Sequence, residues 1–187
     1  MVDTAAVTAL VRSFADHEDG AAMKSAELIL NLLEWSVAPF SRHQYTPGHI
    51  TCSGLVVASD GERILLVHHR RLGRWLLPGG HVEPEDITAA DAARREVVEE
   101  TGAALLPAVT FLGADVHGIP AKGSEPFHLH HDLMFCFRAS TGELRVSDES
   151  HAVAWCALAE FERYELPLNV RRAYRRAVTG RGATECE

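Results

Sequence analysis

The spacing of apolar residues changes near residue 48, and this change limits the folds open to the chain. Before that point, apolar side chains recur at the three- and four-residue intervals of amphipathic helices. After it, short runs rich in β-branched and aromatic residues are separated by turn residues. Helical stretches interrupt these runs without strict alternation. We therefore expect an α+β fold, a sandwich with a mixed β-sheet preceded by a helical extension.

Two amphipathic helices are predicted within the extension, which covers residues 1–47 and includes a linker rich in proline and glycine. The first helix follows Asp3, the expected N-cap, and has apolar residues at i, i+3, i+4 and i+7. In the second helix, Leu28, Leu32 and Trp35 are expected to share one apolar stripe. The sequence indicates no function for this extension, although its apolar faces could form the contact of a homodimer.

The rest of the chain is predicted to form one domain over residues 48–178, followed by a flexible tail over 179–187. The runs "HITCSGLVVAS" and "RILLVHH" are typical of strands joined by the turn "DGE". A helix is expected from about Thr88 to Thr101. Three more strands and a closing helix, "LNVRRAYRRAV", complete the predicted domain.

Charge and cysteine content disfavour several classes of protein. The net charge is -8, whereas non-specific nucleic-acid binding needs an excess of lysine and arginine. The four cysteines form no CxxC pair, which disfavours both a cysteine zinc site and a disulfide framework. The acidic N-terminus does not resemble a signal peptide, and no apolar run approaches the ~18 residues that span a bilayer. We expect a cytoplasmic protein that binds a small molecule, with no membrane or nucleic-acid partner.

The segment "RREVVEETG" places three glutamates on one helical face. Glu96, Glu99 and Glu100 are spaced i, i+3, i+4, and each like-charge pair costs roughly 0.2–0.5 kcal/mol in an isolated helix. They also lie in the last turn, where the helix dipole disfavours anions. A divalent cation would offset both effects, since Mg²⁺ prefers oxygen ligands such as carboxylates. The alternative is a solvated acidic face neutralised by Arg94 and Arg95.

A glycine-rich loop precedes the acidic helix. In "LPGGHVEPED", Gly79 and Gly80 allow a tight turn and leave their carbonyls accessible. Thr88 is the expected N-cap of the helix, and Gly102 suits the position that ends a helix in a left-handed turn. The loop and the helix therefore form one unit, with the acidic face at the far end of the helix.

Residues 80–103 resemble the Nudix box, G-x5-E-x7-R-E-U-x-E-E-x-G-U, where U is a bulky apolar residue. The second half of the pattern is complete in "REVVEETG", residues 95–102. One extra residue separates the two halves, so the first glutamate of the box falls on Asp86 or on Glu85. The last apolar position is the small Ala103.

This resemblance implies the Nudix αβα sandwich and the hydrolysis of a nucleoside diphosphate linked to another group. The implied ligands of Mg²⁺, for which Mn²⁺ could substitute, are Glu96, Glu99, Glu100 and the carbonyl of Gly80. Arg95 is implied to orient a glutamate through an ion pair. Glu96 is the candidate general base.

Charged residues outside the box extend this hypothesis. Members of the family often recruit one more acid, and Glu149, next to Asp148, is the candidate here; the alternative is an ordinary loop acid. Arg70, Arg71 and Arg74 flank the loop before the box and could meet substrate phosphates, although surface loops often carry arginines.

A set of histidines follows in "HLHHD". His128, His130 and Asp132 alternate along a predicted strand, so they would share one side of it. Such a set can ligate zinc or iron, or orient a phosphate or a base of the substrate. Structural histidines and substrate contacts are the commoner outcomes.

Two alternative functions, an isomerase and a ligand sensor, stay open, and so does the choice of substrate. Isopentenyl diphosphate isomerases share the Nudix fold and use a catalytic cysteine, and Cys52 lies in the first predicted strand of the domain. Some Nudix-like domains are ligand sensors without turnover, although they usually lack some of the glutamates of the box. A nucleoside triphosphate, a nucleotide sugar and a non-nucleotide diphosphate are all compatible with the sequence.

Overall fold

The computed structural model describes residues 1–14, 18–140, 143–180 and 184–186. The helices are α1 (Thr4–Ser13), α2 (Gly20–Trp35), α3 (Ala89–Thr101) and α4 (Leu168–Thr179), with a 3-10 turn at Leu158–Glu160. The strands are β1 (Gly48–Val57), β2 (Arg63–His69), β3 (Arg74–Leu76), β4 (Gly79–His81), β5 (Leu105–Ile119), β6 (His128–Ala139), β7 (Ser150–Ala157) and β8 (Thr184–Glu185). Strand β8 falls within the segment expected to be a flexible tail, and it pairs with β5.

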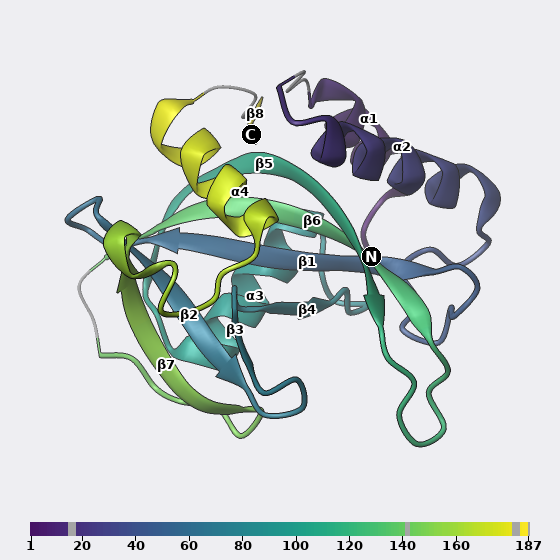
Figure 1. Ribbon diagram of the computed structural model, residues 1–187. Coiled ribbons are helices and arrows are strands. Elements are labelled where there is room, and N and C mark those ends of the chain that lie inside the picture. Colours follow the sequence, from purple (N-terminus) through teal and green to yellow (C-terminus); the bar gives the residue numbers. More distant parts are fainter. Residues whose placement is uncertain (15–17, 141–142, 181–183, 187) are drawn as a thin grey trace.

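One mixed sheet forms the centre of the fold (Figure 1). Its main path runs β3-β2-β1-β6-β5-β8, while β4 pairs with β1 and β7 pairs with β2. Strands β1 and β6 are parallel, and the other pairs are antiparallel. The predicted α+β fold with a mixed sheet is confirmed.

Helices cover both faces of this sheet because successive residues of a strand point to opposite sides. Ile50 and Val56 of β1 belong to a core shared with α1, α2 and α3. Leu55 and Val57 belong to a second core shared with α4. Figure 1 shows α4 in front of the sheet and α3 behind it. We call the side on which Leu55 and Val57 pack the α4 face.

Helix α2 buries a stripe that differs from the predicted one. Ile29, Leu32 and Leu33 are buried in the core, whereas Leu28 is 40% exposed and Trp35 is 79% exposed. The prediction for Leu28 and Trp35 was wrong because the docking of α2 against β5 selects the neighbouring stripe. Ile29, Leu32 and Leu33 are therefore covered by the chain itself, while Leu28 and Trp35 stay at the surface. Among the described residues, no helix is long and apolar enough to cross a membrane.

The N-terminal helices are also tied to α4. Asp19 accepts a hydrogen bond from the N–H of Ala22 at the start of α2, and it accepts 2.8 Å bonds from Arg172 and Arg176. The guanidinium of Arg176 lies 5.4 Å from the ring centre of Phe14. Burial alone would raise the pKa of Asp19, but the bonds from Arg176 and Ala22 outweigh it and lower this pKa. Ion pairs therefore join the extension to the last helix of the domain.

Candidate active site

Helix α3 carries the acidic face, and its ends form as the sequence predicts. The hydroxyl of Thr88 accepts a 3.0 Å hydrogen bond from the N–H of Asp91, whose carboxylate accepts a 3.0 Å bond from the N–H of Thr88. This capping box starts the helix. Gly102 ends it with a φ of 67°, in the left-handed region that favours glycine. Both ends of the helix are thereby fixed relative to the loops around it.

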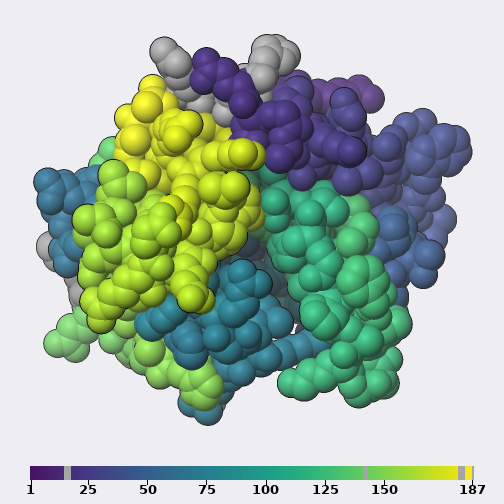
Figure 2. Space-filling view, viewed as in Figure 1, coloured from purple at the N-terminus to yellow at the C-terminus, as the bar shows by residue number. Residues whose placement is uncertain are grey.

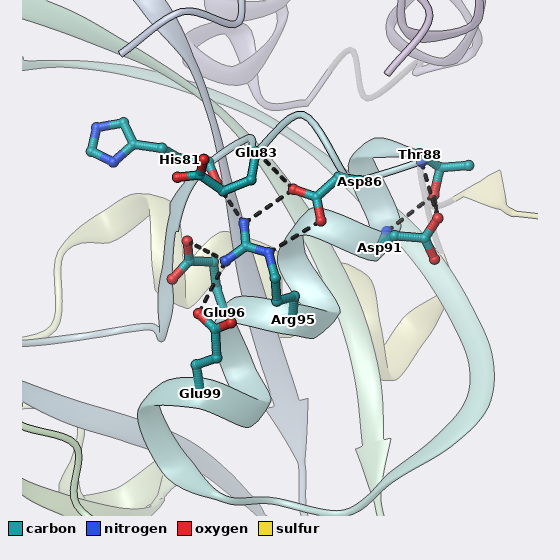
Figure 3. A network of polar contacts seen from close by, with 8 residues as sticks. All are labelled: His81, Glu83, Asp86, Thr88, Asp91, Arg95, Glu96 and Glu99. Carbon is teal, nitrogen blue, oxygen red and sulfur yellow. Dashed lines mark hydrogen bonds and ion pairs between the residues drawn. The ribbon is translucent and has the colours of Figure 1, made fainter. Parts of the chain in front are cut away.

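Arg95 lies at the centre of a polar network (Figure 3). Its Nη1 donates to Glu96, over 3.0 Å, and to Glu99, over 3.1 Å. Its Nη2 donates to the carbonyl of His81 over 2.8 Å. The guanidinium also donates to both carboxylate oxygens of Asp86. Arg95 therefore positions two of the three glutamates and connects them to the loop before α3.

Asp86, rather than Glu85, provides the acid that pairs with Arg95. The side chain of Asp86 is 5% exposed and also accepts a 2.8 Å hydrogen bond from the N–H of Glu83, whereas Glu85 is exposed. Two parallel charge-assisted bonds give this contact both strength and direction. The loop accommodates the extra residue of the box while the carboxylate still reaches the arginine.

The two glycines bring the loop backbone against the acidic face. The N–H of Gly79 donates a 2.9 Å hydrogen bond to the carboxylate of Glu100. A Cβ on Gly80 would lie 2.7 Å from the carboxylate carbon of Glu96, closer than side chains approach. Gly80 pairs with Cys52 of β1, so the sheet fixes its place. Any side chain at this position would push the carboxylate of Glu96 out of its place.

Negative charge accumulates around Glu96 and Glu100. Burial raises the pKa of Glu100 to about 7, and the charges of Glu96 and Glu149 add to the effect. Burial also raises the pKa of Glu96, against the lowering effect of Arg95. Because Glu149 acts on both groups, the acid predicted from outside the box lies near the two inner glutamates. Glu99 is 58% exposed and lies at the outer side of the cluster.

The residues of this cluster fit a divalent cation. Carboxylate oxygens are the ligands that Mg²⁺ prefers. A cation would also relieve the repulsion that raises the pKa of Glu100, since an opposite charge favours the ionised form. The absence of a side chain on Gly80 lets the carboxylate of Glu96 lie against the backbone of the loop. Glu96, Glu99, Glu100, Glu149 and the carbonyl of Gly80 are the groups that would hold the ion.

Arg70, a candidate for substrate binding, contacts the protein backbone. Its Nε donates a 2.8 Å hydrogen bond to the carbonyl of Ser150, and its N–H donates a 2.9 Å bond to the carbonyl of Glu149. These bonds connect the end of β2 to the start of β7. Arg70 therefore holds the loop that carries Glu149.

The other two arginines lie at the β2–β3 turn, where Arg71 follows β2 and Arg74 begins β3. Figure 2 shows a hollow between the β2–β3 segment and the β5–β6 hairpin, on the face that carries α4. Arg71 and Glu125 connect the two sides through a 2.7 Å ion pair. Arg74 is exposed, and its charge acts on His117 of β5.

Histidines from four strands gather on the α4 face. They are His49 of β1, His81 of β4, His117 of β5, and His128 and His130 of β6. Nitrogens of His49, His81 and His130 all lie within 4.8 Å of one another. The predicted alternation of His128 and His130 along β6 therefore holds, but the closest set includes two histidines from other strands.

Asp132, the third member of the predicted set, has a different environment. It is 6% exposed and accepts a 2.9 Å hydrogen bond from the hydroxyl of Thr51. Burial raises its pKa to about 6. Sequence reasoning missed His49 and His81 as neighbours of His130. The sequence does indicate that His49 and Thr51, two residues apart, share one side of a strand. Only the strand pairing shows that His130 lies beside His49 and that His81 lies beside Thr51.

Cys52 does not suit the role of a catalytic thiol. It is completely buried in β1, and burial raises its pKa well above the ordinary value, with the charges of Asp132 and Asp86 adding to the effect. A neutral, enclosed thiol neither reaches a ligand nor acts as a nucleophile at neutral pH. This environment disfavours the isomerase alternative.

Known proteins are similar in sequence to this chain. A family model for the NUDIX domain matches residues 48–177. A MutT-like protein of Streptomyces ambofaciens is 34% identical over 106 residues, which are 57% of this chain and 62% of that protein. A putative 8-oxo-dGTP diphosphatase of Bacillus subtilis (strain 168) is 44% identical over 48 residues, 26% of this chain and 32% of that protein. The chain spans less than two thirds of the length of these relatives.

Solved structures have the same fold. A MutT Nudix hydrolase from Burkholderia pseudomallei aligns with a TM-score of 0.52 and 30% identity, over 67% of this chain and 95% of that one. The Nudix domain of Shewanella oneidensis NrtR, complexed with ADP ribose, aligns with a TM-score of 0.54 and 20% identity, over 70% and 88% of the two chains. The sandwich and its glutamate-bearing helix define a Nudix domain. The chain belongs to the Nudix family.

Proposed function

We propose that the protein hydrolyses the diphosphate linkage of a nucleoside diphosphate derivative and that the reaction depends on Mg²⁺, with Mn²⁺ as a substitute. The convergence of Glu96, Glu99 and Glu100 on the Gly79–Gly80 loop carries the proposal. Such a concentration of carboxylates repels a diphosphate unless a cation joins the two. When bound, the cation supplies charge neutralisation and lowers the pKa of water.

The residues of the chain set the geometry for this chemistry. Arg95 holds Glu96 and Glu99, and the N–H of Gly79 fixes one oxygen of Glu100. Glu96 is the proposed general base, because burial raises its pKa and so makes it a stronger proton acceptor. Arg95 acts as a positioning residue, since its contacts are with the glutamates and the loop.

The relatives support the class of substrate. The NrtR domain binds ADP ribose, and the Bacillus subtilis relative is named for 8-oxo-dGTP. Both compounds contain phosphoanhydride bonds attached to a nucleoside. We therefore place the substrate of this protein among nucleoside diphosphate derivatives.

The test is product release from nucleoside triphosphates, 8-oxo-dGTP, ADP-ribose, nucleotide sugars and dinucleoside polyphosphates, with Mg²⁺, Mn²⁺ or chelator. We expect cation-dependent cleavage that falls by ~100-fold or more in Glu99→Gln and Glu100→Gln, as is usual when transition-state stabilisation is lost. Glu85→Gln is the matched control, because Glu85 is an exposed acid outside the cluster. Incorporation of ¹⁸O from labelled water into the product separates hydrolysis from isomerisation.

Two results would contradict the proposal. Full turnover in both Glu99→Gln and Glu100→Gln would show that the cluster is not the active site. Tight binding of a nucleotide without release of product, in the presence of Mg²⁺, would identify the domain as a sensor.

A further inference from the structure

Three histidines from three strands meet on the α4 face of the sheet. The ring centre of His49 lies 5.1 Å from that of His81 and 4.9 Å from that of His130. Strand pairing fixes this arrangement, because His49 of β1 is the register partner of His130 in parallel β6. Thr51, on the same side of β1 as His49, is the register partner of His81 in β4. The backbone of the sheet thus brings the three rings together.

His49 has a buried nitrogen that lacks a partner. The residue is 1% exposed, and its Nδ1 lies 3.1 Å from the carbonyl of Gln44. A carbonyl only accepts, so Nδ1 carries the proton and Nε2 keeps a lone pair. Among the described residues, this Nε2 has no hydrogen-bond partner. A buried polar atom without a partner is costly, and a metal ion would supply the partner.

The hydrogen bond to Gln44 is also the support that a metal ligand needs. Histidines that bind metals almost always donate their other ring N–H to a backbone carbonyl, a carboxylate or water, which fixes the orientation of the ring. His128 has the same arrangement, since its Nδ1 lies 2.8 Å from the carbonyl of Pro126. Its ring centre is 5.1 Å from that of His49 and 5.2 Å from that of His130. A fourth imidazole therefore lies beside His49 and His130.

We propose that His49, His81 and His130 bind a transition-metal ion of the Zn²⁺ type, at a site separate from the carboxylates of α3. Imidazole suits Zn²⁺, Cu²⁺, Ni²⁺ and iron, whereas Mg²⁺ takes oxygen ligands. Three histidines, with a fourth position for water, substrate or another side chain, form a common Zn²⁺ site.

The spacing of the rings allows such an ion with small movements. Bonds of about 2.0–2.1 Å in a tetrahedron place the ligand nitrogens about 3.3 Å apart. The nitrogens of the three histidines lie within 4.8 Å of one another, so rotations of the side chains bring them onto the ion.

This site adjoins the carboxylate cluster without sharing its ligands. Two consecutive residues of β4 belong to the two sites. Gly80 lies against Glu96 of the carboxylate cluster, and the ring of His81 lies with His49 and His130. Figure 3 shows the ring of His81 directed away from Arg95, while its carbonyl accepts a bond from that arginine. The proposal rests on the histidines alone and does not require that the protein be a hydrolase.

The test is a titration of the full-length protein, first stripped with chelator, with Zn²⁺ against a competing chromophoric chelator and with Co²⁺. Excess Mg²⁺ is present throughout to occupy the carboxylates. We expect one equivalent of tight binding, visible absorption bands of four-coordinate Co²⁺, and imidazole scattering in the X-ray absorption spectrum of the Zn²⁺ form. His130→Gln is expected to weaken binding by at least ~100-fold, since even supporting residues of metal sites contribute ~10–100-fold.

The control variant is His151→Gln, which removes an exposed histidine of β7 whose ring lies 5.5 Å from that of His68. It is expected to bind Zn²⁺ as the wild type does. If His130→Gln does not fold, as judged by circular dichroism, His81→Gln provides the same test. Absence of tight Zn²⁺ or Co²⁺ binding in the wild type would overturn the proposal. So would equal affinity in the folded His130→Gln or His81→Gln protein, or loss of binding in Glu99→Gln and Glu100→Gln.

Discussion

The guanidinium of Arg95 and the carboxylate of Asp86 face each other across two hydrogen bonds, Nε to Oδ1 over 3.1 Å and Nη2 to Oδ2 over 3.0 Å. The pair connects α3 to the loop that contains the extra residue of the Nudix box. Because the same guanidinium also contacts Glu96 and Glu99, the position of the acidic face depends on a residue outside the helix.

Asp86→Ala is therefore expected to destabilise the protein by about 1.5–3 kcal/mol, the usual effect of losing hydrogen bonds to a charged group. Its activity should also fall, since Arg95 would no longer hold the glutamates in place. The free energy of unfolding in urea provides the measurement. Glu85→Ala, which removes the exposed neighbouring acid, should change stability by less than about 0.5 kcal/mol. Equal effects of the two substitutions would show that the ion pair contributes nothing specific.

Gly80→Ala is expected to lower turnover by ~100-fold, because displacement of a catalytic group by about an ångström has effects of that size. The added methyl group would lie 2.7 Å from the carboxylate of Glu96 and force it aside. The steady-state rate with the best substrate of the panel checks this prediction. Gly20→Ala is the control, because no atom lies within 4 Å of the Cβ position there and the residue begins α2. Wild-type turnover in Gly80→Ala would mean that Glu96 need not occupy its present place.

Glu100→Gln is expected to raise the stability of the protein when divalent cations are removed at pH 8. Burial and nearby carboxylates raise the pKa of Glu100 to about 7, so its ionised form is unfavourable in the folded protein without a cation. Glutamine removes this charge and can still accept the hydrogen bond from Gly79. Melting temperatures with chelator and with Mg²⁺ give the measurement. The cation should stabilise the wild type and have a smaller effect on the variant. A less stable Glu100→Gln protein in chelator would refute the electrostatic argument.

Asp19→Asn is expected to destabilise the protein by about 1–3 kcal/mol at neutral pH, since it leaves buried hydrogen-bond donors of Arg176 less well satisfied. Asparagine still caps a helix, so the substitution isolates the ion pairs. The pKa of Asp19 is lowered in the folded state, and its contribution to stability is therefore complete above 3.8, the ordinary pKa of aspartate. The contribution is lost as the pH falls through the lowered value.

The difference between wild type and Asp19→Asn in urea should thus be constant from pH 7 to about 5 and shrink toward pH 3. Asp3→Asn is the matched control, because Asp3 caps α1 through bonds to the N–H groups of Ala5 and Ala6 at an exposed position. Its effect should be small. A pH-independent penalty for Asp19→Asn would attribute the role of Asp19 to packing rather than to charge.

Features that depend on residues close together in the chain could be predicted from the sequence. The capping box at Thr88, the left-handed end at Gly102 and the acidic face of α3 all arise from contacts within one or two helical turns. The change from helical to strand spacing near residue 48 likewise predicts the mixed fold, because the periodicity of apolar residues follows backbone geometry. These local features are also what the resemblance to the Nudix box rests on.

Features that join distant segments required the tertiary structure. The choice of Asp86 over Glu85 depends on how the loop folds back onto Arg95, and the buried stripe of α2 depends on how that helix docks on β5. The meeting of His49 with His130 depends on the register of two parallel strands about 80 residues apart. By itself, the sequence determined the family and the acidic helix, since helical spacing places those glutamates together. The sheet register alone decided which histidines face one another, because no local pattern encodes the pairing of remote strands.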